Sequence, residues 1–95
     1  MHGLFVSVSV DPAGSEDALK DLTSRVVPTV KQSPGFVAAY WFAPREAGGK
    51  LEGYAVLVYD SEANAKQSEQ MAKNAPQPDA VTFTNFDIRE IIASA

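Results

Sequence analysis

The segment at residues 51–60, "LEGYAVLVYD", constrains the fold most, because it is apolar on both faces if it forms a β-strand. Side chains alternate across a strand, which divides the segment into two apolar sets: Tyr54, Val56 and Val58 on one side, and Ala55, Leu57 and Tyr59 on the other. A chain of 95 residues buries only about 60 to 65% of its unfolded surface. We therefore expect the chain to cover one face of this strand itself and a partner to cover the second.

Composition places the chain among ordinary globular proteins, with 45% hydrophobic and 21% charged residues, and residues 1–95 are expected to form a single domain. A net charge of −4 with scattered basic residues argues against a nucleic-acid partner. The absence of cysteine excludes disulfides and thiolate metal sites. No apolar stretch approaches the length of a membrane span, and the start does not fit a secretory signal. We therefore expect a cytoplasmic location and no membrane partner.

The first half of the chain predicts a strand, a helix and a second strand. Residues 4–10 alternate in polarity, with Leu4, Val6, Val8 and Val10 on one face. Apolar residues then recur at helical spacing from residue 18 to residue 30. Pro28 lies within this stripe and should kink or tighten a single helix around residues 24–28. The stop signal "SPG" at residues 33–35 releases a second strand, "FVAAYWFA".

The second half predicts a hairpin, a helix and a final strand. The loop at residues 44–50, "PREAGGK", is too long for a two-residue turn but joins the second strand to the segment 51–60. Ser61 is a helix cap, followed by a face of small residues: Ala65, Ser68, Ala72 and Ala75. The last segment is rich in β-branched and aromatic residues and reads as a long strand, with a bulge predicted at Asn85.

This order of elements predicts an α+β fold, the ferredoxin-like split β-α-β with its βαββαβ order. Its four-stranded antiparallel sheet would carry both helices on one face. The other face would present Phe5, aromatic residues of "FVAAYWF" and one apolar set of the segment 51–60. Apolar surface on this scale usually marks an interaction site, so we expect a second copy of the chain to cover it.

Several stretches resemble the dimeric α+β barrel superfamily, and most closely its small antibiotic-biosynthesis-monooxygenase-like domains and their uncharacterised bacterial relatives. They are "SPGFVAAYWF", the strand-to-helix junction "GYAVLVYDSEANAK" and the ending "FDIREIIASA", and the likeness extends over nearly the whole chain. The resemblance implies a homodimer whose two sheets face each other, often with a small cavity beside each sheet. Members range from cofactor-free oxygenases to haem-degrading enzymes and isomerases, so the fold alone does not choose a reaction.

Candidate ligand-binding residues come from the aromatic group and from the strands that would face the barrel. Trp41 is the first candidate and Tyr54 the second, because Trp and Tyr are enriched in ligand pockets and at interfaces. The remaining candidates for lining the cavity are Phe5, Ser7, Ser9 and Arg89. The serines can orient a polar group and Arg89 can bind a carboxylate or phenolate, although packing, hydration and ion pairing are the commoner roles of such residues.

No catalytic set, metal or cofactor is predicted. His2 is the only histidine and is expected at a frayed, exposed terminus, which leaves no base for acyl transfer and no helical haem ligand. Carboxylates and His do not converge on a metal site in the sequence. The resemblance to cofactor-free oxygenases implies one further possibility, since those enzymes use Asn and Trp to bind and polarise aromatic substrates. Trp41 and Asn64 are the residues that would correspond.

Three functional hypotheses follow. The first is a homodimeric barrel protein that binds a small apolar or aromatic molecule in a cavity beside the sheet. The second is a cofactor-independent monooxygenase acting on a polycyclic aromatic, quinone-forming substrate. The third is a structural or regulatory dimer without a ligand. A cavity of about 300 Å³ or more, lined by Trp41, Tyr54 and a polar group, would favour the first two.

Overall fold

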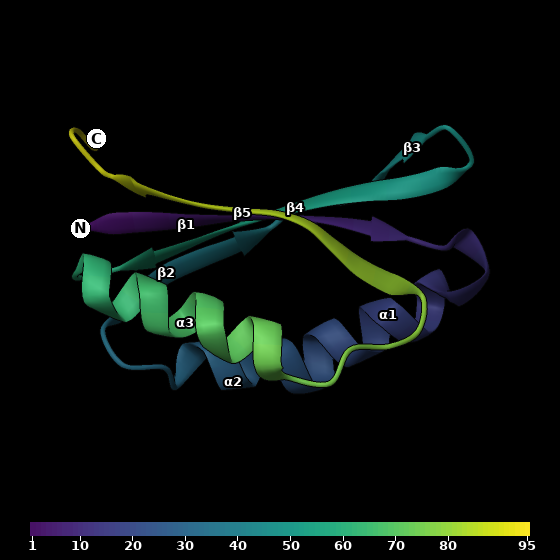
Figure 1. Ribbon diagram of the computed structural model, residues 1–95, viewed down its shortest axis with the longest axis horizontal. Coiled ribbons are helices and arrows are strands. Elements are labelled where there is room, and N and C mark those ends of the chain that lie inside the picture. The colour runs from purple at the N-terminus through teal and green to yellow at the C-terminus, as the bar shows by residue number, and fades with distance from the viewer.

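A computed structural model describes residues 1–95 and shows a single sheet with helices on one side (Figure 1). The strands are β1 (His2–Val10), β2 (Phe36–Trp41), β3 (Arg45–Ala47), β4 (Lys50–Tyr59) and β5 (Val81–Glu90). A 3₁₀ turn, η1 (Pro12–Gly14), leads into a continuous helical stretch made of α1 (Ser15–Asp21), η2 (Leu22–Val26) and α2 (Val27–Lys31). The remaining helix is α3 (Glu62–Asn74).

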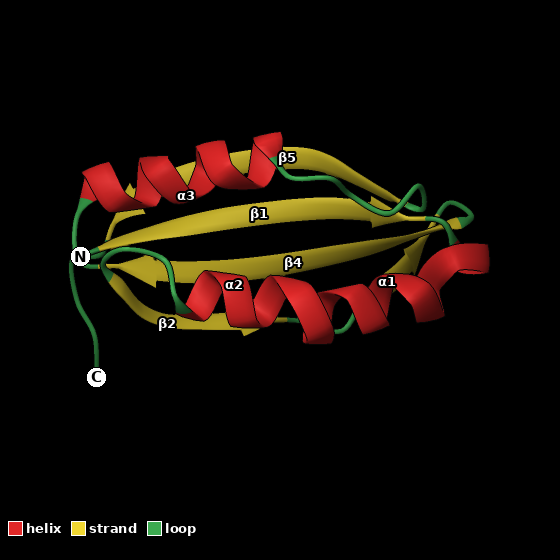
Figure 2. Cartoon of the chain, turned by 90° about the horizontal axis from the view of Figure 1, so that it is seen from below, coloured by secondary structure: helices red, strands yellow, loops and turns green.

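The sheet has the strand order β2-β4-β1-β5, with β3 added beside β4, and all its pairings are antiparallel. This is the predicted ferredoxin-like arrangement, in which the two central strands belong to different halves of the chain. Figure 2 shows α3 running along the β5 and β1 side and the α1–α2 stretch along the β4 and β2 side. Both helical layers therefore cover the same face, as predicted. None of the helices combines the length and apolar character that crossing a membrane requires.

The segment predicted as a loop at residues 44–50 is itself a small hairpin, which corrects the expectation of a longer turn. Strand β3 pairs with the start of β4, and Ala47 lies opposite Lys50. Gly48 and Gly49 form the two-residue connection with φ angles of 60° and 86°. Positive φ at both central positions is the requirement of the type I′ turn, which glycine meets without strain.

Strand β5 contains the predicted bulge, but one residue earlier than Asn85. Ser7 pairs with Asn85 and Val8 pairs with Phe83, so Thr84 is the extra residue on β5. The bulge changes the alternation, and Phe83 and Phe86 both reach the helix side, where their ring centroids are 4.9 Å apart.

The first helix is continuous through Pro28, as predicted, but it widens where we expected a kink or a tighter turn. Residues Leu22–Val26 form a π-helical segment, in which the Val27 N–H donates to the Leu22 carbonyl, five residues earlier. Pro28 has no N–H to offer the preceding turn. The hydroxyl of Ser24 donates to the Lys20 carbonyl at 2.6 Å, which supplies a partner where the helical pattern changes register.

The hydrophobic core lies between the sheet and α3. Leu4, Tyr59 and Ala65 are fully buried, and Leu57 is nearly so. The alternation of β4 predicted two apolar sets, and the structure shows that the set with Ala55, Leu57 and Tyr59 is the covered one. The cap at Ser61 is also confirmed, because its hydroxyl accepts a hydrogen bond from the Asn64 N–H at 3.2 Å.

Candidate functional site

A cavity of about 440 Å³ lies between the helices and the covered face of the sheet. Its lining includes residues of β1 and β4 on the sheet side and residues of the α1–α2 stretch and α3 on the helix side. Of the 31 residues that line it, 20 are hydrophobic. This size and polarity match the sites in which proteins hold small organic molecules, of about 300 to 1,000 Å³.

The cavity remains open because the sheet and α3 present small side chains to it. Strand β4 contributes Gly53 and Ala55, α3 contributes Ala72, and the residue that caps the end of α3 is Ala75. Across from them, no residue of the helical stretch 15–31 is fully buried. The apolar stripe of that stretch, with Leu22, Val26 and Val30, lines the cavity instead of filling the sheet surface. A stripe that the sequence would assign to the core is therefore the wall of the candidate site.

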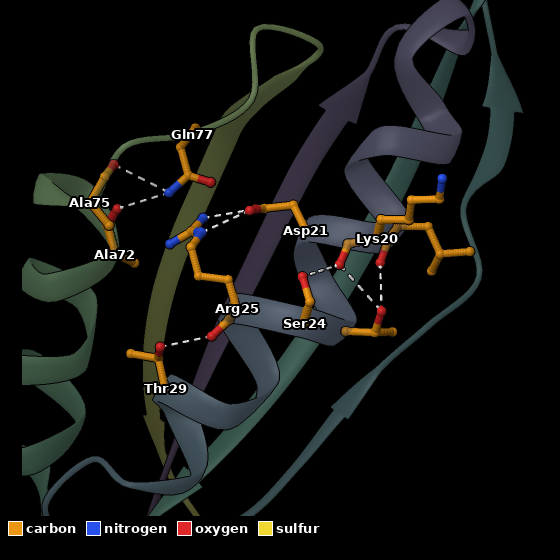
Figure 3. Close-up of polar contacts among 10 residues, drawn as sticks. Lys20, Asp21, Ser24, Arg25, Thr29, Ala72, Ala75 and Gln77 are labelled. Atoms are coloured by element: carbon orange, nitrogen blue, oxygen red, sulfur yellow. Dashed lines mark hydrogen bonds and ion pairs between the residues drawn. The ribbon is translucent and has the colours of Figure 1, made fainter.

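An ion pair on the helical wall supplies two of the three charged residues of the cavity lining, the third being Glu16. The Arg25 guanidinium donates from Nε and Nη2 to the two oxygens of Asp21, both at 2.8 Å. These hydrogen bonds lower the pKa of the Asp21 carboxyl below its usual value and raise the pKa of Arg25. Figure 3 shows this pair and also Gln77, another residue of the cavity lining, whose amide group donates to the carbonyls of Ala72 and Ala75 at the end of α3.

A chain of three hydroxyl groups, with Tyr59 of β4 in the middle, connects the turn after α2 to α3. Ser33 Oγ lies 2.8 Å from the Tyr59 hydroxyl, which lies 2.7 Å from Ser68 Oγ. Ser33 also donates to the Val30 carbonyl at the end of α2. Tyr59 is completely buried, whereas both serines belong to the cavity lining.

The structure separates the predicted site residues into two groups. Trp41 pairs with Ala55 on the helix side of the sheet and lines the cavity. Tyr54 borders the same cavity, but strand alternation places its side chain on the other face, where its hydroxyl donates to Glu52 at 2.7 Å. That bond raises the pKa of Tyr54, because ionisation would set two negative charges side by side.

Phe5, Ser7, Ser9 and Arg89 lie on the uncovered face and are not part of the cavity lining. Phe5 pairs with Val56 and Ser7 with Tyr54, so these side chains share that face. Arg89 donates to Asp87 on its own strand at 2.9 Å.

Aromatic side chains dominate the uncovered face near the centre of the sheet. Phe5 is 44% exposed, Tyr54 53% and Tyr40 62%. Tyr40 pairs with Val56, which in turn pairs with Phe5, so the three lie side by side across β2, β4 and β1. Figure 1 shows no helix above this face.

Two further residues of the sequence hypotheses lie away from the cavity. The Asn64 side chain donates to Asp60 Oδ1 at 2.8 Å at the start of α3, so it is not placed beside Trp41. His2 is the first residue of β1 and is ordered against α3, with Nε2 at 3.5 Å from Glu62, which corrects the expectation of a frayed terminus. The structure contains no cluster of three or more His, Asp or Glu side chains that could hold a metal ion.

Sequence reasoning missed the polar residues of the cavity lining, among them Asp21, Arg25, Ser33, Ser68 and Gln77. Asp21 and Arg25 carried a local signal, since an acid four residues before a base supports a helical ion pair. Ser68 carried another, because it is the polar member of an otherwise alanine face. Neither signal says which cavity the side chain faces.

Comparisons with solved structures give the fold independently of sequence similarity. A protein from Bacillus cereus assigned as an antibiotic biosynthesis monooxygenase matches with a TM-score of 0.65 and 15% identity, covering 100% of this chain and 94% of its own. A protein from Shewanella loihica assigned as a monooxygenase matches with a TM-score of 0.62 and 17% identity, over 98% and 96% of the two chains.

A third solved structure is a monooxygenase from the gene ActVA-Orf6 of Streptomyces coelicolor, in complex with Nanaomycin D. It matches with a TM-score of 0.52 and 18% identity, over 99% of this chain and 92% of its own. No protein-family model and no curated protein matches the sequence. The chain therefore has the α+β fold of the antibiotic-biosynthesis-monooxygenase-like proteins, as its sequence resemblance implied.

Proposed function

We propose that this protein is a small homodimer that binds an apolar or aromatic molecule in the cavity beside its sheet. The observation that carries the proposal is the cavity itself, about 440 Å³ in volume and lined mainly by hydrophobic residues. Trp41 supplies an aromatic surface within it, and Ser68 and Arg25 supply polar groups. A mostly apolar pocket with a few placed polar groups is the common design of small-molecule sites.

The homodimer part of the proposal rests on the uncovered face of the sheet. Phe5, Tyr40 and Tyr54 are exposed there around Val56, and a second copy would bury such a patch against the same patch of its own. Ser7, Ser9 and Arg89 would then lie at the interface between the two sheets and not in the cavity. A cytoplasmic location, without a membrane or nucleic-acid partner, remains our expectation from the sequence.

Binding is tested with the intrinsic fluorescence of Trp41, which is the only tryptophan of the chain and lines the cavity. We use 1-adamantanol as the probe, because it is compact and does not absorb where tryptophan does. The expected result is a saturable change in Trp41 emission, matched by heat in a calorimetric titration.

A matched pair of variants on α3 shows whether the probe occupies the cavity. Ala72→Phe puts a ring into the cavity and should weaken probe binding by roughly tenfold or more, a loss of at least about 1.4 kcal/mol. Ala63→Phe makes the same change at an exposed position outside the cavity lining and should leave binding unchanged. Equal binding by both variants, or no saturable signal from the wild type, would favour a structural or regulatory dimer without a ligand.

A cofactor-independent monooxygenase is the second candidate function. It is supported by the solved structures of the same fold that are described as monooxygenases, one of them with Nanaomycin D bound. Oxygen uptake with hydroxynaphthalene-type substrates, in the absence of metal and flavin, tests it. Measurable binding of these compounds without oxygen uptake would leave the protein as a binder.

A further inference from the structure

We propose that Ser68 presents a hydrogen-bond acceptor to the bound molecule, so that the site selects ligands whose buried end carries an O–H or N–H donor. The ligand class is then an apolar alcohol, phenol or amine, and an ether, ketone or plain hydrocarbon of the same shape is disfavoured. This inference rests on the proposed ligand binding in the cavity and deepens it.

The direction of the hydroxyl chain follows from counting its protons. Ser33 has one hydroxyl proton, and it is used in the hydrogen bond to the Val30 carbonyl, which can only accept. The Ser33 oxygen must therefore accept from the Tyr59 hydroxyl, 2.8 Å away. Tyr59 has then used its only proton, so its oxygen accepts from Ser68 at 2.7 Å.

Ser68 has thus donated its only proton to Tyr59 and retains acceptor lone pairs. Its neighbours on the same helical face, Met71, Ala72 and Ala75, also line the cavity. Ser68 is only 6% exposed, so bulk water has little access to its hydroxyl. A buried acceptor is satisfied by a ligand donor, whereas a ligand carbonyl or ether would place two acceptors against each other.

The Val30 carbonyl anchors the hydroxyl chain at its Ser33 end and so fixes the direction of its hydrogen bonds. The Val30 carbonyl belongs to the last turn of α2, where no later helical N–H is available to a carbonyl in the regular pattern. The bonds that it accepts include those from the backbone N–H and the hydroxyl of Ser33. Removing the Ser33 hydroxyl would free the Tyr59 proton to turn toward Ser68, and the chain would reverse.

The experiment compares 1-adamantanol with 1-methoxyadamantane, in which a methyl group replaces the hydroxyl proton and so removes the donor, by calorimetry on the full chain. For each protein we measure the ratio of the ether's Kd to the alcohol's Kd. Dividing a variant's ratio by the wild-type ratio cancels the difference in hydrophobicity between the two probes. In Ser68→Ala this ratio should fall by about 3- to 10-fold, the effect of one neutral hydrogen bond. Ser68→Thr keeps the hydroxyl and should keep the ratio.

Ser33→Ala provides the test that a merely structural role does not mimic. With the chain reversed, Tyr59 donates to Ser68, and the Ser68 proton becomes available to the ligand. The ether should then bind about 3- to 10-fold more tightly than it binds to the wild type. General loosening of the site would instead weaken both probes together.

The outcomes separate the inference from the function on which it rests. If neither probe binds the wild type, the proposed function fails. If both bind and the ratio is unchanged in Ser68→Ala, or the ether does not gain affinity in Ser33→Ala, the cavity binds ligands but Ser68 does not select them, and the inference is overturned.

Discussion

Gly35 lies directly against the side chain of Asn64, so closely that a methyl group on Gly35 would overlap the Asn64 amide and the Asp60 carboxylate. The Gly35 carbonyl also accepts a hydrogen bond from the Asp60 N–H at 2.9 Å. Two stretches that carry the family resemblance, "SPG" and "YDSEANAK", therefore meet in one structural junction. The close packing at this junction leaves no room for a side chain at residue 35.

Replacing Gly35 with Ala should lower the free energy of unfolding by roughly 2 kcal/mol or more, because strain at a φ of +73° adds to the overlap with Asn64. Gly48→Ala is the matched control, since its φ is +60° but no atom lies near the added methyl group. The control should cost about 1 kcal/mol. Urea unfolding of both variants measures the difference, and equal losses would show that the junction is loosely packed.

The Asp21–Arg25 pair predicts how the cavity wall responds to acid. Because Arg25 lowers the pKa of Asp21 in the folded chain, the pair stabilises the fold at pH values above the unfolded pKa of Asp21, near the ordinary 3.8. That contribution is lost as the pH falls through the lowered folded value. Carboxyl NMR titration should place the Asp21 midpoint below 3.8 in the wild type and return it toward 3.8 in Arg25→Gln. An unchanged midpoint in the variant would contradict the pair.

The uncovered face predicts the oligomeric state. Val56→Arg places a charge between Phe5 and Tyr40 and should convert a dimer to a monomer in sedimentation experiments, because a buried unpaired charge is strongly unfavourable. Ala63→Arg adds the same charge on α3, at an exposed position, and should leave the dimer intact. A wild-type protein that sediments as a monomer would remove the dimer proposal and leave the cavity proposal standing.

Two truncations distinguish the packed core from the cavity wall. Leu57 is only 5% exposed and belongs to the core cluster, so Leu57→Ala should cost about 2 to 4 kcal/mol of unfolding free energy. Val26 is half-buried and lines the cavity, so Val26→Ala should cost less than about 1.5 kcal/mol while weakening probe binding. Thermal or urea unfolding measures the first effect and titration of the probe the second. A comparable stability loss in both variants would mean that the helical stretch 15–31 is packed like the rest of the core.

Local patterns were enough to predict the fold and its two faces. The alternation in residues 51–60 divided the side chains of β4 into two sets on opposite faces, and the cap at Ser61 located the start of α3, because both depend on neighbours within a few residues. Which of the two sets is buried follows only from the packing of the helices. The bulge near Asn85 was predicted one residue late, since the pairing of Ser7 and Val8 determines its position. The π-helical widening before Pro28 was also missed, because a proline can be accommodated in several ways and tertiary packing chooses among them.

The candidate site depends on distances that no local pattern contains. The sequence determined an amphipathic helix, an alanine-rich helix and a strand with two apolar faces. Only the tertiary structure decided that the first helix stands off the sheet, which turns Leu22 and Val26 into cavity walls and moves the site from the uncovered face to the covered one. The same holds for Ser33, Tyr59 and Ser68, which join into one hydroxyl chain because three elements separated in sequence converge. Periodicity reports which way a side chain points, but the space it points into is set by the packing of the other elements.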